Sequence, residues 1–323
     1  MVSQEELFSS DQAVYDLKQL FGLREVLETL DLAAPPTARI LSPEIPPPLH
    51  RVGILCGSFN PLTLAHTELA ERACATFGLD RVRFTLAKVT VDKEHVTGLG
   101  LEDRLLLLSL YAQRHGHIGV ALVNCGLYVD QAQAFRSLLG PQVELQFVVG
   151  MDKLVQILDP RYYQDREAAL RQLFALASLI VANRGDMAEE EFNRLLDQPE
   201  NRAYRSYARF CPLSTAFTDV SATAVRHALA AGESVNLQVP TESAEFLSET
   251  QAFAPLRQYD GEVVDAYAVR QKLLTLLSSV RAWAEQEVDF RNLVQAALST
   301  EVKGQALRAA STTTELASLI RSL

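Results

Sequence analysis

The chain is poor in cysteine, and its four cysteines lack the spacing of a structural zinc site or a disulfide scaffold. They are Cys56, Cys74, Cys125 and Cys211, which lie far apart and include no C-x-x-C pair. Scattered cysteines of this kind are typical of a reducing compartment, where thiols remain free. We therefore expect a cytoplasmic protein whose fold depends on neither zinc nor disulfides.

Positive charge is also scarce. The 323 residues include 30 Lys and Arg against 40 Asp and Glu, which gives a formal net charge of −10 at pH 7. Binding to the backbone of a nucleic acid requires a positive surface. The charge balance therefore argues against a nucleic-acid partner, although a local basic pocket for nucleotide phosphates remains compatible with it.

Long apolar runs and several common catalytic motifs are missing as well. No run approaches the ~20 apolar residues that cross a bilayer, and the N-terminus has no signal-peptide pattern. There is no Walker A motif, no G-x-G-x-x-G, no nucleophile elbow and no H-E-x-x-H. His115 and His117 have no carboxylate or cysteine at metal-binding spacing. We therefore expect no membrane association and no protein-bound metal.

What is present is a regular alternation of short apolar runs and amphipathic segments between residues 51 and 182. This alternation predicts an α/β fold of the Rossmann-like kind, with a parallel sheet covered by helices on both faces. Ligands of such sheets bind beyond the carboxyl ends of the strands. The segments 57–66, 88–93 and 150–152 each follow an expected strand, so we expect them at that edge.

The two ends of the chain differ from this middle. Residues 11–31 have helical periodicity, and an extended linker is predicted by Pro35, Pro36, Pro46, Pro47 and Pro48. From residue 255 onward the pattern is helical throughout, which suggests an appended hairpin or bundle of helices. The chain thus divides into an N-terminal helix and linker (1–50), a catalytic domain (51–254) and a helical C-terminal extension (255–323).

The most informative segment is RVGILCGSFNPLTLAH at 51–66. An apolar run ends at Gly57, which lets the backbone approach a ligand closely. The chain then enters a helix whose N-terminus offers unpaired N–H groups and a positive dipole end to an anion. Thr63 and His66 are three residues apart and so share a helix face. The segment predicts a phosphate-binding loop; the alternative is an ordinary turn with a surface histidine.

A second segment, DVSATAVR at 219–226, predicts another anion site. Ser221 is a favourable N-cap, and Thr223 and Arg226 fall in the first turns of the helix. A guanidinium can grip phosphate oxygens with two parallel bonds. The alternative is an ordinary capped helix with a solvated arginine.

Together these segments resemble the nicotinamide and nicotinate mononucleotide adenylyltransferases. Gly57, Ser58, Phe59, Asn60, Pro61, Thr63 and His66 match their pattern G-[ST]-F-N-P-x-[HT]-x-x-H, and Ser221, Thr223, Val225 and Arg226 match I-S-[ST]-T-x-[IV]-R. Thr63 stands where several relatives have a first histidine, and Ala222 replaces the usual serine. The resemblance covers residues 51–254, about two-thirds of the chain.

The resemblance implies that the 5′-phosphate of nicotinamide or nicotinate mononucleotide attacks the α-phosphorus of ATP, with Mg²⁺ bridging the ATP phosphates. NAD or deamido-NAD and pyrophosphate are the products. The implied catalytic residues are His66, Thr63 and Arg226. The implied ATP-binding residues are Gly57, Ser58, Phe59, His66, Gly150, Asp152, Arg184, Ser221, Thr223 and Arg226. The implied mononucleotide-binding residues are Ser58, Phe59, Lys93, Tyr128 and Tyr162.

Several alternatives remain open at this stage. Asp152 could be only a helix cap, Arg184 only a solvated arginine, and either Lys88 or Lys93 could meet the phosphate. Tyr128 and Tyr162 could merely pack their helices onto the sheet. The fold also fits an enzyme with another phosphomonoester acceptor, or an inactive nucleotide-binding regulator. The preference between the amide and the acid mononucleotide, a possible homo-oligomer and the roles of 1–50 and 255–323 are not determined by the sequence.

Overall fold

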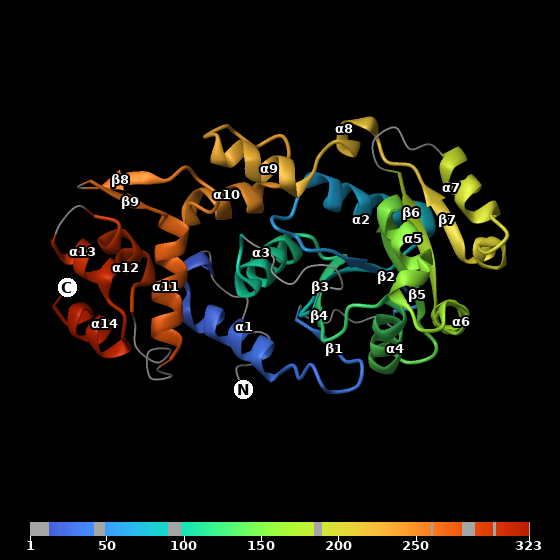
Figure 1. Ribbon diagram of the computed structural model, residues 1–323, viewed down its shortest axis with the longest axis horizontal. Coiled ribbons are helices and arrows are strands. Elements are labelled where there is room, and N and C mark those ends of the chain that lie inside the picture. The colour runs from blue at the N-terminus through green and yellow to red at the C-terminus, as the bar shows by residue number, and fades with distance from the viewer. Residues whose placement is uncertain are drawn as a thin grey trace.

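The computed structural model describes residues 13–41, 49–89, 98–183, 189–259, 261–279, 288–299 and 302–322 (Figure 1). Its centre is a seven-stranded sheet in the order β1-β4-β3-β2-β5-β6-β7. Neighbouring strands are parallel except β1, which runs antiparallel to β4. The strands are β1 Ala38–Ile40, β2 Arg51–Cys56, β3 Arg81–Ala87, β4 Ile118–Val123, β5 Glu144–Gly150, β6 Ala177–Ala182 and β7 Ala208–Cys211.

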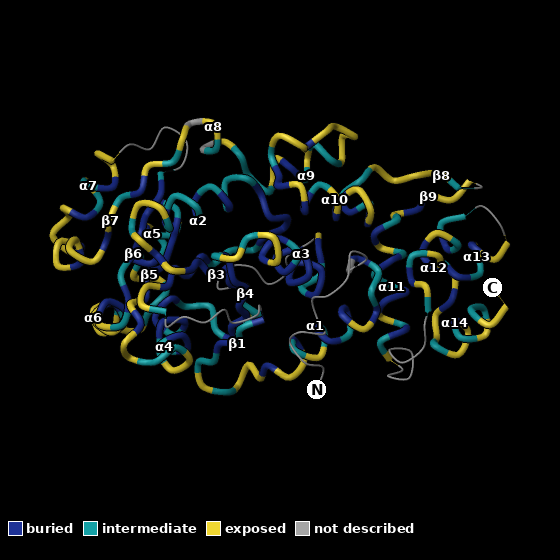
Figure 2. Tube along the Cα trace, turned by 180° about the vertical axis from the view of Figure 1, so that it is seen from behind, coloured by how far each residue is buried: buried dark blue, intermediate teal, exposed yellow. Residues whose placement is uncertain are grey.

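Helices cover both faces of this sheet, as the alternating pattern predicts. On one face, Leu55 and Phe84 share a core with the helices α2 (Leu64–Phe77) and α3 (Leu101–Arg114). On the other face, Ile54 and Phe147 pack with α4 (Tyr128–Leu139), α5 (Met151–Leu158) and α6 (Arg166–Leu176). Because successive strand residues point to opposite faces, the continuous apolar runs of β2 to β6 serve both cores. Figure 2 shows these strands as the buried centre of the molecule. The expected Rossmann-like fold is confirmed.

The strand order places a crevice between β2 and β5. Strands β3 and β4 lie to one side of β2, and β5 to β7 lie to the other. The helix after β2 packs on one face of the sheet, and the helix after β5 packs on the opposite face. Loops that diverge in this way leave a ligand-binding crevice at the carboxyl edge.

The remaining central segments lie beyond β6. They are α7 Glu189–Asp197, a 3₁₀ helix η4 Arg202–Tyr207, α8 Thr215–Thr218, α9 Ala222–Ala230 and α10 Thr241–Thr250. None of the helices in the described parts of the chain is both long and apolar enough to cross a membrane.

Both ends of the chain pack on the α3 side of the sheet. The N-terminal part forms a short 3₁₀ helix, η2 (Ala13–Tyr15), and α1 (Leu17–Thr29). The C-terminal part forms α11 (Ala266–Ser278), α12 (Phe290–Ala297), α13 (Val302–Ala309) and α14 (Thr313–Ile320). In Figures 1 and 2 α11 lies between α3 and the last three helices. Leucines of α1 and α11 belong to the same buried cluster as α3, so the ends extend the central core.

The structure corrects two details of the sequence interpretation. Residues after 255 are not helical throughout, because β8 (Arg257–Tyr259) and β9 (Glu262–Val264) form a hairpin that turns at Gly261, whose φ is +84°. The extended segment after α1 is not only a linker, since Ala38–Ile40 adds an edge strand to β4. Three-residue strands are too short for a periodic pattern to reveal.

Candidate active site

The loop between β2 and α2 is held in a fixed shape. The Gly57 N–H donates to the Thr85 carbonyl at 3.2 Å, which ties the loop to β3. Phe59 has a positive φ of 42° and lies buried against the rings of His66 and Phe84, with centroid distances of 5.1 and 5.3 Å. A Cβ on Gly57 would come within 3.0 Å of the Phe59 ring. Glycine at 57 therefore lets the loop close over Phe59.

Thr63 and His66 are bonded to each other at the start of α2. Thr63 is the N-cap and is fully buried. Its backbone N–H donates to Nδ1 of His66 at 3.1 Å, and its Oγ1 lies 2.8 Å from the same atom. A backbone N–H can only donate, so Nδ1 must be an acceptor. The ring proton of neutral His66 is therefore on Nε2.

A second group of donors comes from the N-terminus of α9. Ser221 caps this helix, and its Oγ accepts from the Ala224 N–H at 3.1 Å. Arg226 donates to the Asn60 carbonyl at 2.8 Å and to Thr223 Oγ1 at 3.1 Å. These two bonds bring the guanidinium against the loop after β2. The two segments that the sequence analysis singled out are thus in direct contact.

Two adjoining cavities open at this edge of the sheet. The first has a volume of about 160 Å³ and the second a volume of about 510 Å³. They share four lining residues, Cys56, Gly57, Ser58 and Lys153. The loop after β2 therefore forms the common wall of two compartments, a geometry suited to bringing two ligands together.

The second cavity collects the expected ATP-binding residues. Asp152 lies in the first turn of α5, whose N-cap is Gly150 rather than Asp152. A Cβ on Gly150 would come within 2.7 Å of the Asp152 carboxylate, so a larger residue there would displace this side chain. The expected residues that line the cavity are Gly57, Ser58, Phe59, Thr63, His66, Gly150, Asp152, Ser221, Thr223 and Arg226.

The first cavity is lined by aromatic residues and by two cations. Tyr128 packs edge-on against Phe147 with a centroid distance of 5.1 Å, and burial raises its pKa well above the ordinary value. Tyr162 is half-buried at the same cavity. Phe59, which we expected to meet the mononucleotide, lines the second cavity instead. The two tyrosines therefore provide rings at which a flat heterocycle can stack.

The sequence analysis missed Arg104 and Lys153 as site residues. Arg104 lines the first cavity, is 5% exposed, and donates from Nε to the Leu99 carbonyl at 2.7 Å. Burial lowers its pKa, and the charge of nearby Arg226 acts in the same direction. Lys153 donates to Gln156 at 2.6 Å. The only signal in the sequence that Lys153 belongs to the site was its position directly after the expected site residue Asp152.

Of the site candidates Lys88, Lys93 and Arg184, the structure describes Lys88. Lys88 donates from Nζ to the carbonyls of Leu27 and Leu30, at 2.6 and 2.8 Å, and so caps the end of α1. It is therefore committed to packing the N-terminal helix. Lys93 and Arg184 lie outside the described residues.

The fold and the site define a class. A parallel sheet with a glycine-containing loop after β2, faced by a capped helix carrying an arginine, is the arrangement of a nucleotide-binding α/β protein. The chain belongs to the cytidylyltransferase-like family, whose model matches residues 54–228. The resemblance drawn from the two sequence segments is thus confirmed.

Two proteins with similar sequences agree with this assignment. A probable nicotinate-nucleotide adenylyltransferase of Trichlorobacter lovleyi is 28% identical over 220 residues, which cover 64% of this chain and 100% of that protein. A protein of the same name from Herpetosiphon aurantiacus is 28% identical over 211 residues, covering 64% and 99%. About a third of this chain therefore lies outside the matched region. Plasmodium falciparum nicotinic acid mononucleotide adenylyltransferase complexed with NaAD is similar over 63% of this chain and 97% of its own, with 14% identity and a TM-score of 0.47.

Proposed function

We propose that this protein transfers the adenylyl group of ATP to nicotinate mononucleotide, giving deamido-NAD and pyrophosphate in NAD biosynthesis. The observation that carries the proposal is the pair of cavities that meet at Gly57 and Ser58. One is lined by phosphate-binding groups and the other by tyrosines. The names of the relatives favour the acid over the amide mononucleotide, and nicotinamide mononucleotide is the alternative acceptor.

The reaction requires positioning more than proton transfer. The 5′-phosphate of the mononucleotide is already ionised near neutral pH, so it needs no general base. One of its oxygens bonds to the α-phosphorus of ATP, the bond from that phosphorus to the bridging oxygen breaks, and pyrophosphate leaves. Catalysis then consists of aligning the two phosphates and stabilising the charge that develops on them.

His66 and the α9 terminus supply that stabilisation in the proposal. Because Nδ1 of His66 accepts from Thr63, the Nε2–H is the donor that reaches an α-phosphate oxygen. Thr63 acts by orienting the imidazole. Arg226, with Ser221 and Thr223, holds the β- and γ-phosphates, since it lies across the same cavity. Gly150 and Asp152 receive the nucleoside part of ATP.

The first cavity receives the mononucleotide. Tyr128 and Tyr162 lie where the pyridine ring would enter, and Ser58 lies on the wall shared with the ATP side. The guanidinium of Arg104 is close enough to that of Arg226 to affect its pKa. Two cations so close together suit a bound anion, so we assign Arg104 to the mononucleotide phosphate.

Mg²⁺ enters this proposal as part of the ATP substrate. Among the described residues no group of three or more His, Cys, Asp or Glu side chains could hold a metal ion. Mg²⁺ is commonly bound through substrate phosphates and water, with few protein ligands. The ion would neutralise charge on the phosphates while Arg226 contacts them. We place the reaction in the cytoplasm, in keeping with the four free thiols.

The test is pyrophosphate release with ATP and Mg²⁺, offering nicotinate and nicotinamide mononucleotide separately. We expect turnover with the acid, a lower kcat/KM with the amide, and a loss of at least roughly 100-fold in kcat for His66→Ala. His50→Ala is the matched control, because His50 is exposed at the opposite end of β2. ATP binding without turnover on either mononucleotide would favour an inactive nucleotide-binding regulator, and wild-type turnover in the His66 variant would remove His66 from the mechanism.

A further inference from the structure

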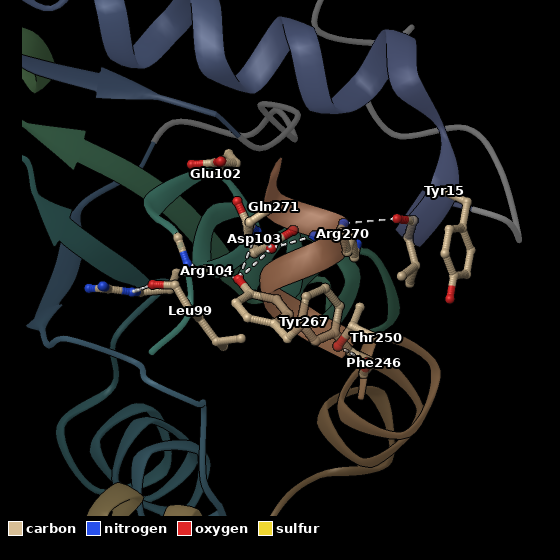
Figure 3. Close-up of polar contacts among 12 residues, drawn as sticks. Tyr15, Leu99, Glu102, Asp103, Arg104, Phe246, Thr250, Tyr267, Arg270 and Gln271 are labelled. Carbon is tan, nitrogen blue, oxygen red and sulfur yellow. Dashed lines mark hydrogen bonds and ion pairs between the residues drawn. The ribbon is translucent and has the colours of Figure 1, made fainter. Parts of the chain in front are cut away.

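A buried polar cluster joins α11 to the first turn of α3 (Figure 3). Asp103 and Arg270 are both fully buried, and NH1 of Arg270 lies 2.5 Å from Oδ2 of Asp103. The hydroxyl of Tyr267 donates to the same oxygen at 2.6 Å, and the side-chain amide of Gln271 also donates to it. Three side chains of one helix thus converge on one carboxylate oxygen.

The cluster also holds the backbone just before Asp103 and that of the N-terminal segment. The Gly100 N–H donates to the Tyr267 hydroxyl at 2.9 Å, and Gly100 is the N-cap of α3. NH2 of Arg270 donates to the Val14 carbonyl at 3.0 Å, which adds the N-terminal segment. The Tyr267 hydroxyl therefore accepts from the start of the α3 turn and donates to its third helical residue.

The opposite side of the same turn faces the active site. The Leu99 N–H donates to Asn60 Oδ1 at 2.9 Å, and the Asn60 carbonyl accepts from Arg226. The Leu99 carbonyl accepts from Nε of Arg104 at 2.7 Å. Figure 3 shows the Arg104 guanidinium beside Leu99, on the side away from Arg270. One turn thus connects α11 to two groups of the site.

We propose that Tyr267, together with Arg270, positions Arg104 for the mononucleotide, so that contacts from α11 help to shape the first cavity. This inference rests on the proposed function. Helix α11 lies beyond the residues matched by the family model, which end at 228. A protein consisting only of the matched residues 54–228 would lack the contacts that α11 makes with α3.

Two physical points favour positioning over packing alone. Apolar residues of similar volume usually stabilise a buried contact as well as an ion pair does. Here, Oδ1 of Asp103 is buried without a hydrogen-bond partner within the described structure, which adds a cost that apolar packing would avoid. The cluster instead fixes the turn that carries Arg104, where an error of ~1 Å can cost 10²-fold in rate.

The test is Tyr267→Phe, which removes one hydroxyl and keeps the ring. We expect the KM for the mononucleotide to rise by roughly 10-fold while the KM for ATP changes less than twofold. Arg104 belongs to the turn that loses a constraint, whereas Arg226 keeps its bond to the Asn60 carbonyl. Tyr204→Phe is the matched control: Tyr204 is also buried and its hydroxyl donates to a carboxylate, Glu167, at 2.7 Å, but it lies in η4. Melting temperatures of both variants are measured in parallel.

A double-mutant cycle separates positioning from general destabilisation. If Tyr267 acts through Arg104, adding Tyr267→Phe to Arg104→Lys raises the mononucleotide KM little beyond the Arg104→Lys value. Additive effects, or equal losses for ATP and mononucleotide, would overturn the inference while leaving the proposed function intact. A wild-type protein that releases no pyrophosphate would overturn the proposed function and this inference with it.

Discussion

At the scale of single residues, the contact between Thr63 and His66 has the clearest chemical meaning. The sequence places a hydroxyl and an imidazole three residues apart, and we interpreted both as phosphate ligands. The structure bonds them to each other, at 2.8 Å. The N-cap residue of α2 thus determines which tautomer His66 adopts. The three-residue spacing in the sequence does not reveal this contact.

This contact predicts a graded effect for Thr63→Val. The variant keeps the backbone N–H bond to Nδ1 and loses the hydroxyl bond, worth about 1 kcal/mol. We expect kcat to fall roughly fivefold, far less than in His66→Ala. Thr67→Val is the control, because its hydroxyl bonds to the Leu64 carbonyl in the same helix. An unchanged kcat in steady-state pyrophosphate release would show that the backbone bond alone orients His66.

The four cysteines give a second prediction at this scale. Burial raises the pKa of the Cys74 and Cys125 thiols to about 12 and that of Cys211 to about 11. Burial raises the pKa of Cys56 still further. A raised pKa keeps the thiol protonated at neutral pH, and the thiolate is the reactive form. An aromatic disulfide reagent should therefore titrate the native thiols slowly at pH 7.5 and all four at once in denaturant. A fast-reacting native thiol would contradict this.

At the scale of elements, helices and long strands follow the sequence pattern, whereas short strands and end contacts do not. The runs at β2 to β6 are apolar enough to be identified directly. The strand Ala38–Ile40 and the two strands of the β8–β9 hairpin have only three residues each. They form because they pair with a neighbouring strand, β4 for Ala38–Ile40 and each other for β8 and β9. Arg104, Arg270 and Lys88 look like ordinary charged residues of a helix or loop. The partners of Arg270 and Lys88 lie far away in sequence, and Arg104 donates to a backbone carbonyl, which no side-chain pattern reveals.

The link between α3 and α11 predicts a large stability effect for Arg270→Met. The substitution leaves the Asp103 carboxylate buried without its cation, which typically costs about 3–5 kcal/mol. Arg291→Met is the control, because its ion pair with Glu249 is about 40% exposed on both sides, and such surface pairs contribute about 0–1 kcal/mol. Denaturation in guanidinium chloride should separate the two variants. Equal small losses would mean that water reaches Asp103.

At the scale of the whole molecule, the sequence predicts the architecture and most of the candidate residues that line the two cavities, but not how the ends of the chain pack against them. The two motif segments identify the cavity because their residue types are dictated by phosphate chemistry. The ends have no such chemical signature; their role follows from contacts such as that between Arg24 and Glu102 at 2.7 Å, where a residue of α1 meets the first turn of α3. Amphipathic helices can pack in many places, so periodicity alone does not locate them.

The distance along the chain between Asp103 and Arg270 also has a consequence for protein synthesis. The two residues are 167 positions apart, so a ribosome working at roughly 5–20 residues per second needs roughly 10–30 s to make the cation after the carboxylate. The strands of the sheet are all translated before that cation. A nascent chain released before α11 would contain every signature residue of the active site, yet its Asp103 would have no counter-ion. A stop codon between residues 255 and 270 should therefore yield substrates for chaperones and proteases rather than a shortened enzyme.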